Sequence, residues 1–125
     1  MPHIVLEYSA NLPELSDFRA LFTEVHQVLH RTGGIKIENC KSRVREAGHY
    51  HVGDGHADNA FVHLDVEFVK GRSAEVRQSI GRECLEVLKK YYQAQLSDRL
   101  QLTVKIDDIA LDFYFKEPAG TLNYQ

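Results

Sequence analysis

Tryptophan is absent from this 125-residue sequence, and cysteine, methionine and proline are scarce, with two, one and three residues. The two cysteines, Cys40 and Cys84, lie far apart in no spacing typical of a metal or redox site. An excess of basic charge is also lacking, because 15 lysines and arginines stand against 18 acidic residues, a formal net charge of −3. We therefore do not expect a nucleic acid partner.

Long hydrophobic runs are missing as well. No apolar stretch approaches the roughly 20 residues of a membrane span, so we expect no membrane partner. The first seven residues contain no lysine or arginine and already include Glu7, which is not the pattern of a secretory signal peptide. Together with the two isolated cysteines, these absences predict a cytoplasmic protein with reduced thiols.

The remaining composition is that of a globular protein. Hydrophobic residues make up 43% of the chain and charged residues 26%. A chain of 125 residues is long enough for one domain and too short for two ordinary ones. We therefore predict a single domain over residues 1–125.

The first half of the chain, about residues 2–45, has the pattern of strand, helix and strand. Its helix is indicated by apolar residues that recur at steps of three and four after a capping residue, Ser16 or Asp17. The pair Gly33-Gly34 is typical of a helix end. The predicted elements are a strand over residues 3–8, a helix that begins at Phe18 and ends at the glycines, and a strand from Ile35 to Val44.

The second half, about residues 60–110, repeats this pattern after a polar, glycine-bearing connector. Alternation of apolar and polar residues predicts a strand over residues 60–69, which Gly71 ends. Ser73 is a suitable N-cap for the helix that follows. The predicted elements are a loop over residues 46–59, a strand over 60–69, a helix from Ser73 to Tyr91 and a strand from Leu102 to Ile109.

Two such halves predict an α/β (α+β) fold. A crossover through a helix returns the second strand parallel to the first, so each half is a βαβ unit. Two consecutive units form a four-stranded sheet with both helices on one face. We expect the other face to carry β-branched and aromatic side chains that further copies of the chain cover, which predicts a homo-oligomer.

Pro2 is the first candidate for chemistry. Proline after the initiator methionine permits removal of that methionine, which exposes a secondary amine at the start of a strand. An ordinary terminal amine has a pKa of about 7.7–8, and both an apolar pocket and nearby cations lower it. A neutral amine of this kind can take and return a carbon-bound proton near pH 7. If Met1 is retained, the Pro2 nitrogen is an amide and cannot act as a base.

Basic residues are candidates for binding a substrate anion. Lys41, Arg43 and Arg45 alternate along a predicted strand, so their side chains share one face of the sheet. Lys70 and Arg72 form a second basic cluster before the second helix. Arginine binds carboxylates through two parallel hydrogen bonds and keeps its charge at every working pH. We therefore expect a small carboxylate as the ligand.

Histidines gather in the connector, at His49, His51 and His56, with Asp58 beside them. Imidazole and carboxylate suit zinc and related ions, but this spacing matches no known zinc template. We therefore predict no metal site.

Five short motifs follow one another along the chain. They are Met-Pro-His-Ile-Val-Leu-Glu-Tyr at the start, Lys41-Ser42-Arg43-Val44, Asp54-Gly55 with Asp58, Ala60-Phe61-Val62-His63 and Gly71-Arg72-Ser73. Taken in this order, they resemble the 5-carboxymethyl-2-hydroxymuconate Δ-isomerase family of the tautomerase superfamily. The resemblance covers nearly the whole chain, including its length and its doubled βαβ plan.

The resemblance implies a tautomerase-like homotrimer with its sheets packed inside. It also implies a cofactor-free isomerase of homoprotocatechuate degradation that moves a double bond in an unsaturated hydroxy or keto acid. Pro2 is then the general base, and Arg72 binds a carboxylate or stabilises the dienolate. An arginine of the family aligns with Lys41. A lysine keeps the positive charge at this position but cannot form the two parallel hydrogen bonds that an arginine forms with a carboxylate. Arg43 matches the second basic residue of that motif.

Two alternatives follow from the same residues. Lysine at position 41 is compatible with a tautomerase-like enzyme that acts on a different unsaturated keto acid. Retention of Met1 is compatible with a trimeric binding protein that has no activity.

Overall fold

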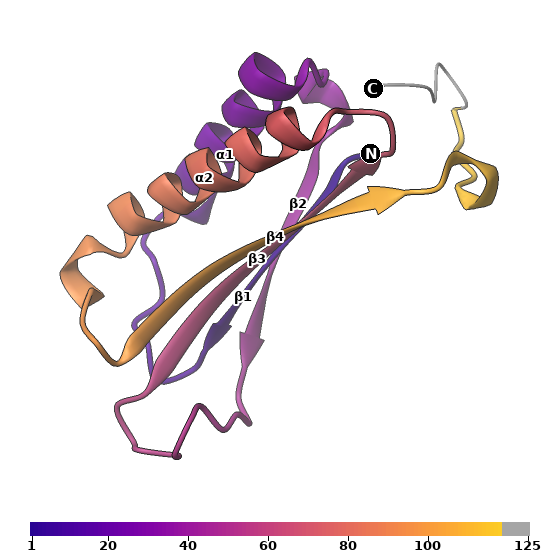
Figure 1. The fold of residues 1–125 in the computed structure, drawn as a ribbon. Helices are drawn as coiled ribbons and strands as arrows, with labels where there is room; N and C mark the ends of the chain where they lie inside the picture. The colour runs from indigo at the N-terminus through magenta and orange to yellow at the C-terminus, as the bar shows by residue number, and fades with distance from the viewer. Residues whose placement is uncertain (119–125) are drawn as a thin grey trace.

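The structure is a computed structural model that describes residues 1–118. Two helices cover one face of a four-stranded sheet (Figure 1). The sheet order is β2-β1-β3-β4, with β1 parallel to β2, antiparallel to β3, and β3 parallel to β4. The elements are β1 (His3–Ser9), α1 (Phe18–Gly33), η1 (Ile37–Asn39), β2 (Lys41–Ala47), β3 (Ala60–Val69), α2 (Ala74–Tyr91), η2 (Gln93–Gln95), β4 (Leu100–Ile109) and η3 (Leu111–Phe113).

Each helix begins and ends as the sequence predicts. The Asp17 side chain accepts a hydrogen bond from the Ala20 amide at the start of α1. Gly34 ends this helix with a φ of 67°, a left-handed conformation that glycine adopts without strain. The Ser73 hydroxyl accepts from the Val76 amide at the start of α2.

The core lies between the helices and one face of the sheet. Alternate residues of β1 and β3 point into it, and the apolar stripes of both helices cover them. Full burial of one such aliphatic side chain contributes about 1.5–3 kcal/mol. Fully buried members include Ile4, Leu6, Leu21, Val25, Leu29, Val62, Leu64, Val66, Phe68, Ile80 and Leu88.

The second strand begins later than predicted. It runs over Lys41–Ala47, and the preceding segment forms the 3-10 turn η1 instead of strand. The register explains this difference, because the first residue of β1, His3, pairs with Lys41. Residues before Lys41 therefore have no partner in β1, and their backbone bonds close locally, from Asn39 N to Lys36 O and from Cys40 N to Ile37 O.

The uncovered face of the sheet also differs from the expectation. It is mostly polar or charged, and the prediction of a β-branched and aromatic face is wrong. Val5, Phe61 and Val69 are the apolar members among the alternate positions of β1 and β3. The charged groups on this face include Glu7 of β1, Arg43 and Arg45 of β2, and Asp65 and Glu67 of β3.

The N-cap of α2 generates a test of this fold. Ser73→Ala removes the acceptor for the Val76 amide, so we expect the free energy of unfolding to fall by about 1 kcal/mol in urea denaturation. Ser79→Ala makes the same change inside the same helix and is the matched control, with an expected change below about 0.5 kcal/mol. Equal effects of the two substitutions would contradict the cap.

Candidate active site

One end of the sheet collects the predicted site residues. The start of β1 lies beside the start of β2 and the end of β3, because the first pair is parallel and the second antiparallel. Pro2 directly precedes β1, Lys41 opens β2, and Arg72 follows β3. In Figure 1 the amino-terminus lies at this end, beside the last residues of β3. The fold thus brings residues that are far apart in sequence to the same end of the sheet.

The terminal amine and a lysine ammonium share one carbonyl oxygen. The Met1 nitrogen donates to Asn39 O at 3.0 Å, and Lys41 Nζ donates to the same oxygen at 2.7 Å. The Lys41 amide also donates to Pro2 O at 3.1 Å, which fixes the start of β2 against this end of β1. Met1 is only 1% exposed, and Pro2 is buried behind it.

This environment lowers the pKa of the terminal amine from 8.0 to about 5. Burial is the largest cause, followed by the hydrogen bond and the charge of Lys41 and then by the charge of Lys116. The nearby Cys40 acts in the opposite direction. An amine at this position is therefore uncharged at neutral pH, which is the state that accepts a proton.

Arg43 and Arg45 lie with Lys41 on the open face of the sheet, as the alternation predicts. Arg43 Nη1 lies 3.2 Å from Nδ1 of His3, the residue after Pro2. Both arginines line a shallow cavity of about 240 Å³ on this face, together with Val5, Glu7, His63, Asp65 and Glu67. The cationic side of the open face therefore begins next to the terminal amine.

Arg72 lies on the opposite side of the sheet, facing the helices. It is 7% exposed, and its guanidinium stands 5.2 Å from the centre of the buried Phe68 ring. Its Nε donates to Gly33 O at 2.6 Å, and Nη1 donates to Val69 O at 3.4 Å. Gly33 is the last residue of α1, where the helix dipole favours a cation. Arg72 therefore joins the end of α1 to the turn after β3.

Sequence reasoning missed two groups at this end. The Asn39 carbonyl belongs to the backbone of a 3-10 turn, and a backbone acceptor leaves no residue-type signal. Tyr114 follows η3, and its hydroxyl oxygen lies 2.8 Å from His3 Nε2. The alternation of β1 places His3 on the open face, but no pattern in the sequence connects it with a residue 111 positions away.

Comparison with known proteins fits this arrangement. The family model for 5-carboxymethyl-2-hydroxymuconate isomerase matches residues 2–119. The chain belongs to this isomerase family. The 5-carboxymethyl-2-hydroxymuconate Delta-isomerase of Escherichia coli is 34% identical over 125 residues, which is 100% of this chain and 93% of the relative. The resemblance read from the sequence is confirmed, and with it the enzyme class.

Solved structures confirm the predicted fold class. A 5-carboxymethyl-2-hydroxymuconate isomerase from Deinococcus radiodurans R1 has a TM-score of 0.82 at 29% identity, covering 93% of this chain and 88% of that one. A fused 4-OT, described as a wild-type symmetric trimer, has a TM-score of 0.73 over 96% of this chain and 95% of that chain. At 10% identity the second likeness shows the tautomerase-type fold alone.

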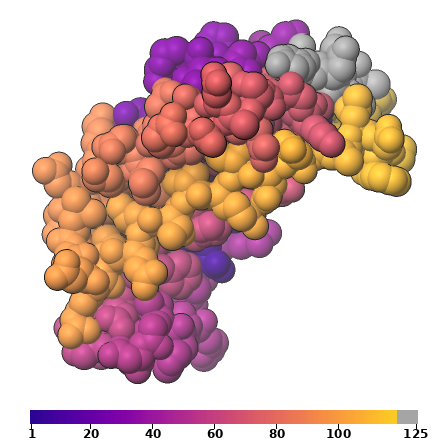
Figure 2. Space-filling view, in the orientation of Figure 1, coloured from indigo at the N-terminus to yellow at the C-terminus, as the bar shows by residue number. Residues whose placement is uncertain are grey.

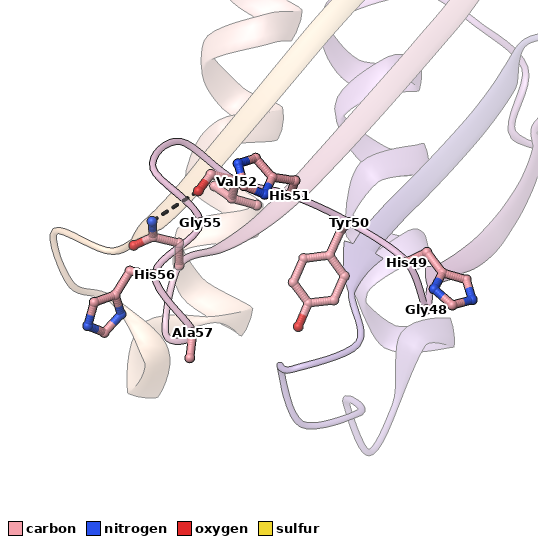
Figure 3. A pocket seen from close by; sticks show the side chains of 9 residues that line it. Gly48, His49, Tyr50, His51, Val52, Gly55, His56 and Ala57 are labelled. Atoms are coloured by element: carbon pink, nitrogen blue, oxygen red, sulfur yellow. Dashed lines mark hydrogen bonds between the residues drawn. The ribbon is translucent and has the colours of Figure 1, made fainter.

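The histidine-rich loop lies at the far end of the sheet from the terminal amine of this isomerase. It follows β2, which starts beside His3 and runs parallel to β1. A cavity of about 440 Å³ opens among its side chains, but the imidazoles of His49, His51 and His56 do not converge there (Figure 3). Among residues 1–118, no group of three or more histidine, cysteine or acidic side chains is arranged to hold a metal ion.

No helix within this same range is both long and apolar enough to cross a membrane.

The shared carbonyl predicts how Lys41 affects the terminal amine. Lys41→Met keeps the length of the side chain and removes its charge, so the ammonium form costs less and the pKa of the amine rises from about 5. The pH dependence of amine acylation by a mild reagent, read by mass spectrometry, measures this shift. Lys89→Met on α2 is the control and leaves the pKa unchanged. An unaltered pKa in Lys41→Met would exclude coupling between the two amines.

Proposed function

We propose that this isomerase moves a carbon–carbon double bond in an unsaturated hydroxy or keto di- or tricarboxylic acid, with Pro2 as the general base. The substrate we favour is 5-carboxymethyl-2-hydroxymuconate, an intermediate of homoprotocatechuate degradation, after which the family and its Escherichia coli relative are named. The observation that carries the proposal is the place of Pro2 at the start of β1, where burial and Lys41 lower the pKa of the Met1 amine that precedes it. The reaction needs no cofactor.

The proposal requires that Met1 be removed. In the chain as described, the Pro2 nitrogen is part of the peptide bond to Met1. After removal, the Pro2 nitrogen becomes a secondary amine at the same end of β1, close to the cations that act on the Met1 amine. Removal also vacates the buried volume that Met1 occupies, which gives a substrate access to the new amine.

The chemistry is a proton transfer from one atom of the substrate to another. Neutral Pro2 takes a proton from the dienol oxygen, or from the carbon next to the carbonyl group. The electron pair left behind spreads through the conjugated system onto oxygen, which gives a dienolate. The resulting prolinium returns the proton to a carbon further along, so the double bond shifts and no atom is gained or lost.

Three cations are proposed to hold the carboxylates and the dienolate. Lys41 and Arg43 approach from the open face, and Arg72 approaches from the helix side. Fixed cations at a developing oxyanion commonly contribute about 3–4 kcal/mol each. Lys41 binds as a point charge and lacks the two-pronged geometry of arginine. A related unsaturated keto acid is therefore the second candidate substrate.

We also propose that the protein assembles as a homotrimer and acts in the cytoplasm. The open face carries cations on β2 and acids on β1 and β3, so that copies meeting there bring opposite charges together. The fused 4-OT of the same fold is described as a trimer. Phe113 and Phe115 are 84% and 87% exposed in the single chain, and a neighbouring copy is the expected cover for them. Cys40 and Cys84 are free thiols, as suits a reducing compartment.

The base is tested with Pro2→Ala, which keeps a terminal amine and removes the rigid ring. We expect kcat/KM for 5-carboxymethyl-2-hydroxymuconate, followed by ultraviolet absorbance, to fall by at least about 100-fold with an unchanged melting temperature. Intact mass serves as the control and must show that Met1 is lost in both proteins. Full activity in Pro2→Ala, or in protein that retains Met1, would remove Pro2 from the mechanism. The same assay with 2-hydroxymuconate separates the two candidate substrates.

Arg72 is tested with Arg72→Lys, which keeps a positive charge but loses the planar guanidinium. We expect kcat/KM to fall by about 100-fold. The melting temperature falls modestly, since the Gly33 carbonyl loses its donor. Arg77→Lys makes the same change on α2, where Arg77 Nε pairs with Asp108 at 3.5 Å, and retains activity. If both variants turn over substrate alike, Arg72 has a structural role alone.

A further inference from the structure

Tyr114 turns back from the end of β4 to the start of β1. Its hydroxyl oxygen lies 2.8 Å from His3 Nε2, and the two rings meet edge to face, with centroids 5.9 Å apart at 64°. Phe113 and Phe115 on either side are 84% and 87% exposed, whereas Tyr114 is half-buried. Figure 1 shows this segment beyond β4 at the end of the sheet where the amino-terminus lies, and Figure 2 shows it projecting from the body of the molecule.

Arg43 decides which way the hydrogen bonds of His3 run. Arg43 Nη1 lies 3.2 Å from His3 Nδ1, and a guanidinium can only donate. Nδ1 must therefore be the unprotonated nitrogen that accepts this bond. In a neutral imidazole the proton then lies on Nε2, which donates to the Tyr114 oxygen. Because this oxygen accepts from His3, the hydroxyl proton of Tyr114 points elsewhere.

The charges around His3 keep its ring neutral. Burial lowers the pKa of His3 from 6.5, and the cations Arg43 and Lys41 lower it further, joined by the terminal amine when it is protonated. Glu67 of β3 pairs with His3 in register on the opposite flank, and Tyr114 covers the ring from the segment after β4. At pH 7 the imidazole is thus uncharged, as its contact with Arg43 requires.

We infer that Arg43, His3 and Tyr114 form a fixed chain of hydrogen bonds that aims the Tyr114 hydroxyl proton at an oxygen of the substrate held before Pro2. Tyr114 is then a specificity-determining donor, and His3 is its positioning residue. A hydroxyl that accepts one hydrogen bond becomes a better donor of the next, which suits a carboxylate or enolate oxygen. This inference rests on the proposed function, because it assumes that the substrate binds beside the terminal amine.

Tyr114→Phe tests the donor, because it removes the hydroxyl and keeps the ring against His3. We expect kcat/KM for 5-carboxymethyl-2-hydroxymuconate to fall about tenfold or more, the size of effect for a lost hydrogen bond to a charged group. If the fall comes from a higher KM, the Tyr114 hydroxyl donates its hydrogen bond to a substrate carboxylate. If it comes from a lower kcat, the hydroxyl donates to the enolate oxygen. Tyr50→Phe in the far loop is the matched control and leaves both constants unchanged. An unchanged kcat/KM in Tyr114→Phe overturns the inference.

His3→Leu tests the positioning role through a double-mutant cycle. We expect this substitution to lower kcat/KM several-fold in the natural sequence and to have no further effect in Tyr114→Phe, because His3 acts through the tyrosine hydroxyl. Equal costs in the two backgrounds would show that His3 acts independently of Tyr114. Circular dichroism and melting temperature verify that each variant folds.

The nitrogen-15 spectrum of the imidazoles tests the chain without any turnover. The His3 signals are assigned by their loss in His3→Leu, and at pH 7 they should show a bare Nδ1 and a protonated Nε2. A protonated Nδ1 overturns the inference whether or not the protein is active. If Pro2→Ala retains activity and Tyr114→Phe loses it, the proposed base fails and the donor stands. If Pro2→Ala loses activity and Tyr114→Phe retains it, the inference alone fails.

Discussion

The register between β1 and β2 is the constraint on which the site depends. It is fixed at its first rung by the hydrogen bond from the Lys41 amide to the Pro2 carbonyl, 3.1 Å long. A slip of one residue would turn Lys41, Arg43 and Arg45 from the open face into the apolar core. Burying these three charges without partners would cost more free energy than the altered pairing could return. The core therefore selects the one register that keeps these cations on the open face and sets Lys41 beside the terminal amine.

The proposed substrate-binding cations are held at this end of the sheet in two different ways. Lys41 and Arg43 stay on the open face, where their charges remain hydrated in the single chain. Arg72 is nearly buried, and its charge is tolerated because the last carbonyl of α1, the Val69 carbonyl and the face of Phe68 surround it. Folding thus fixes Arg72 through carbonyl groups of the core side, whereas Lys41 and Arg43 are positioned on the open face by Asn39 O and His3 Nδ1.

Local pattern and fold class were within reach of the sequence, because periodicity and capping act over a few residues. The caps Asp17 and Ser73 and the shared face of Lys41, Arg43 and Arg45 follow from such patterns. The late start of β2 does not follow from a local pattern, because it depends on where β1 begins. The prediction of an apolar open face is wrong, because copies of a chain can also meet through side chains of opposite charge. Long-range contacts such as His3 with Tyr114 have no local signature at all.

Burial and cations act on the amine and on a bound carboxylate in different ways. Both lower the pKa of the amine, so each keeps it uncharged and ready to accept a proton. The same cations attract a carboxylate, whose charge in turn offsets theirs at short range. A substrate that occupies Lys41 and Arg43 therefore raises the pKa of the amine it approaches, which makes that amine a stronger base when the substrate is in place. Once the proton has been returned and the product carboxylate has left, the pKa of the amine falls again, so the free enzyme begins the next cycle with an uncharged amine.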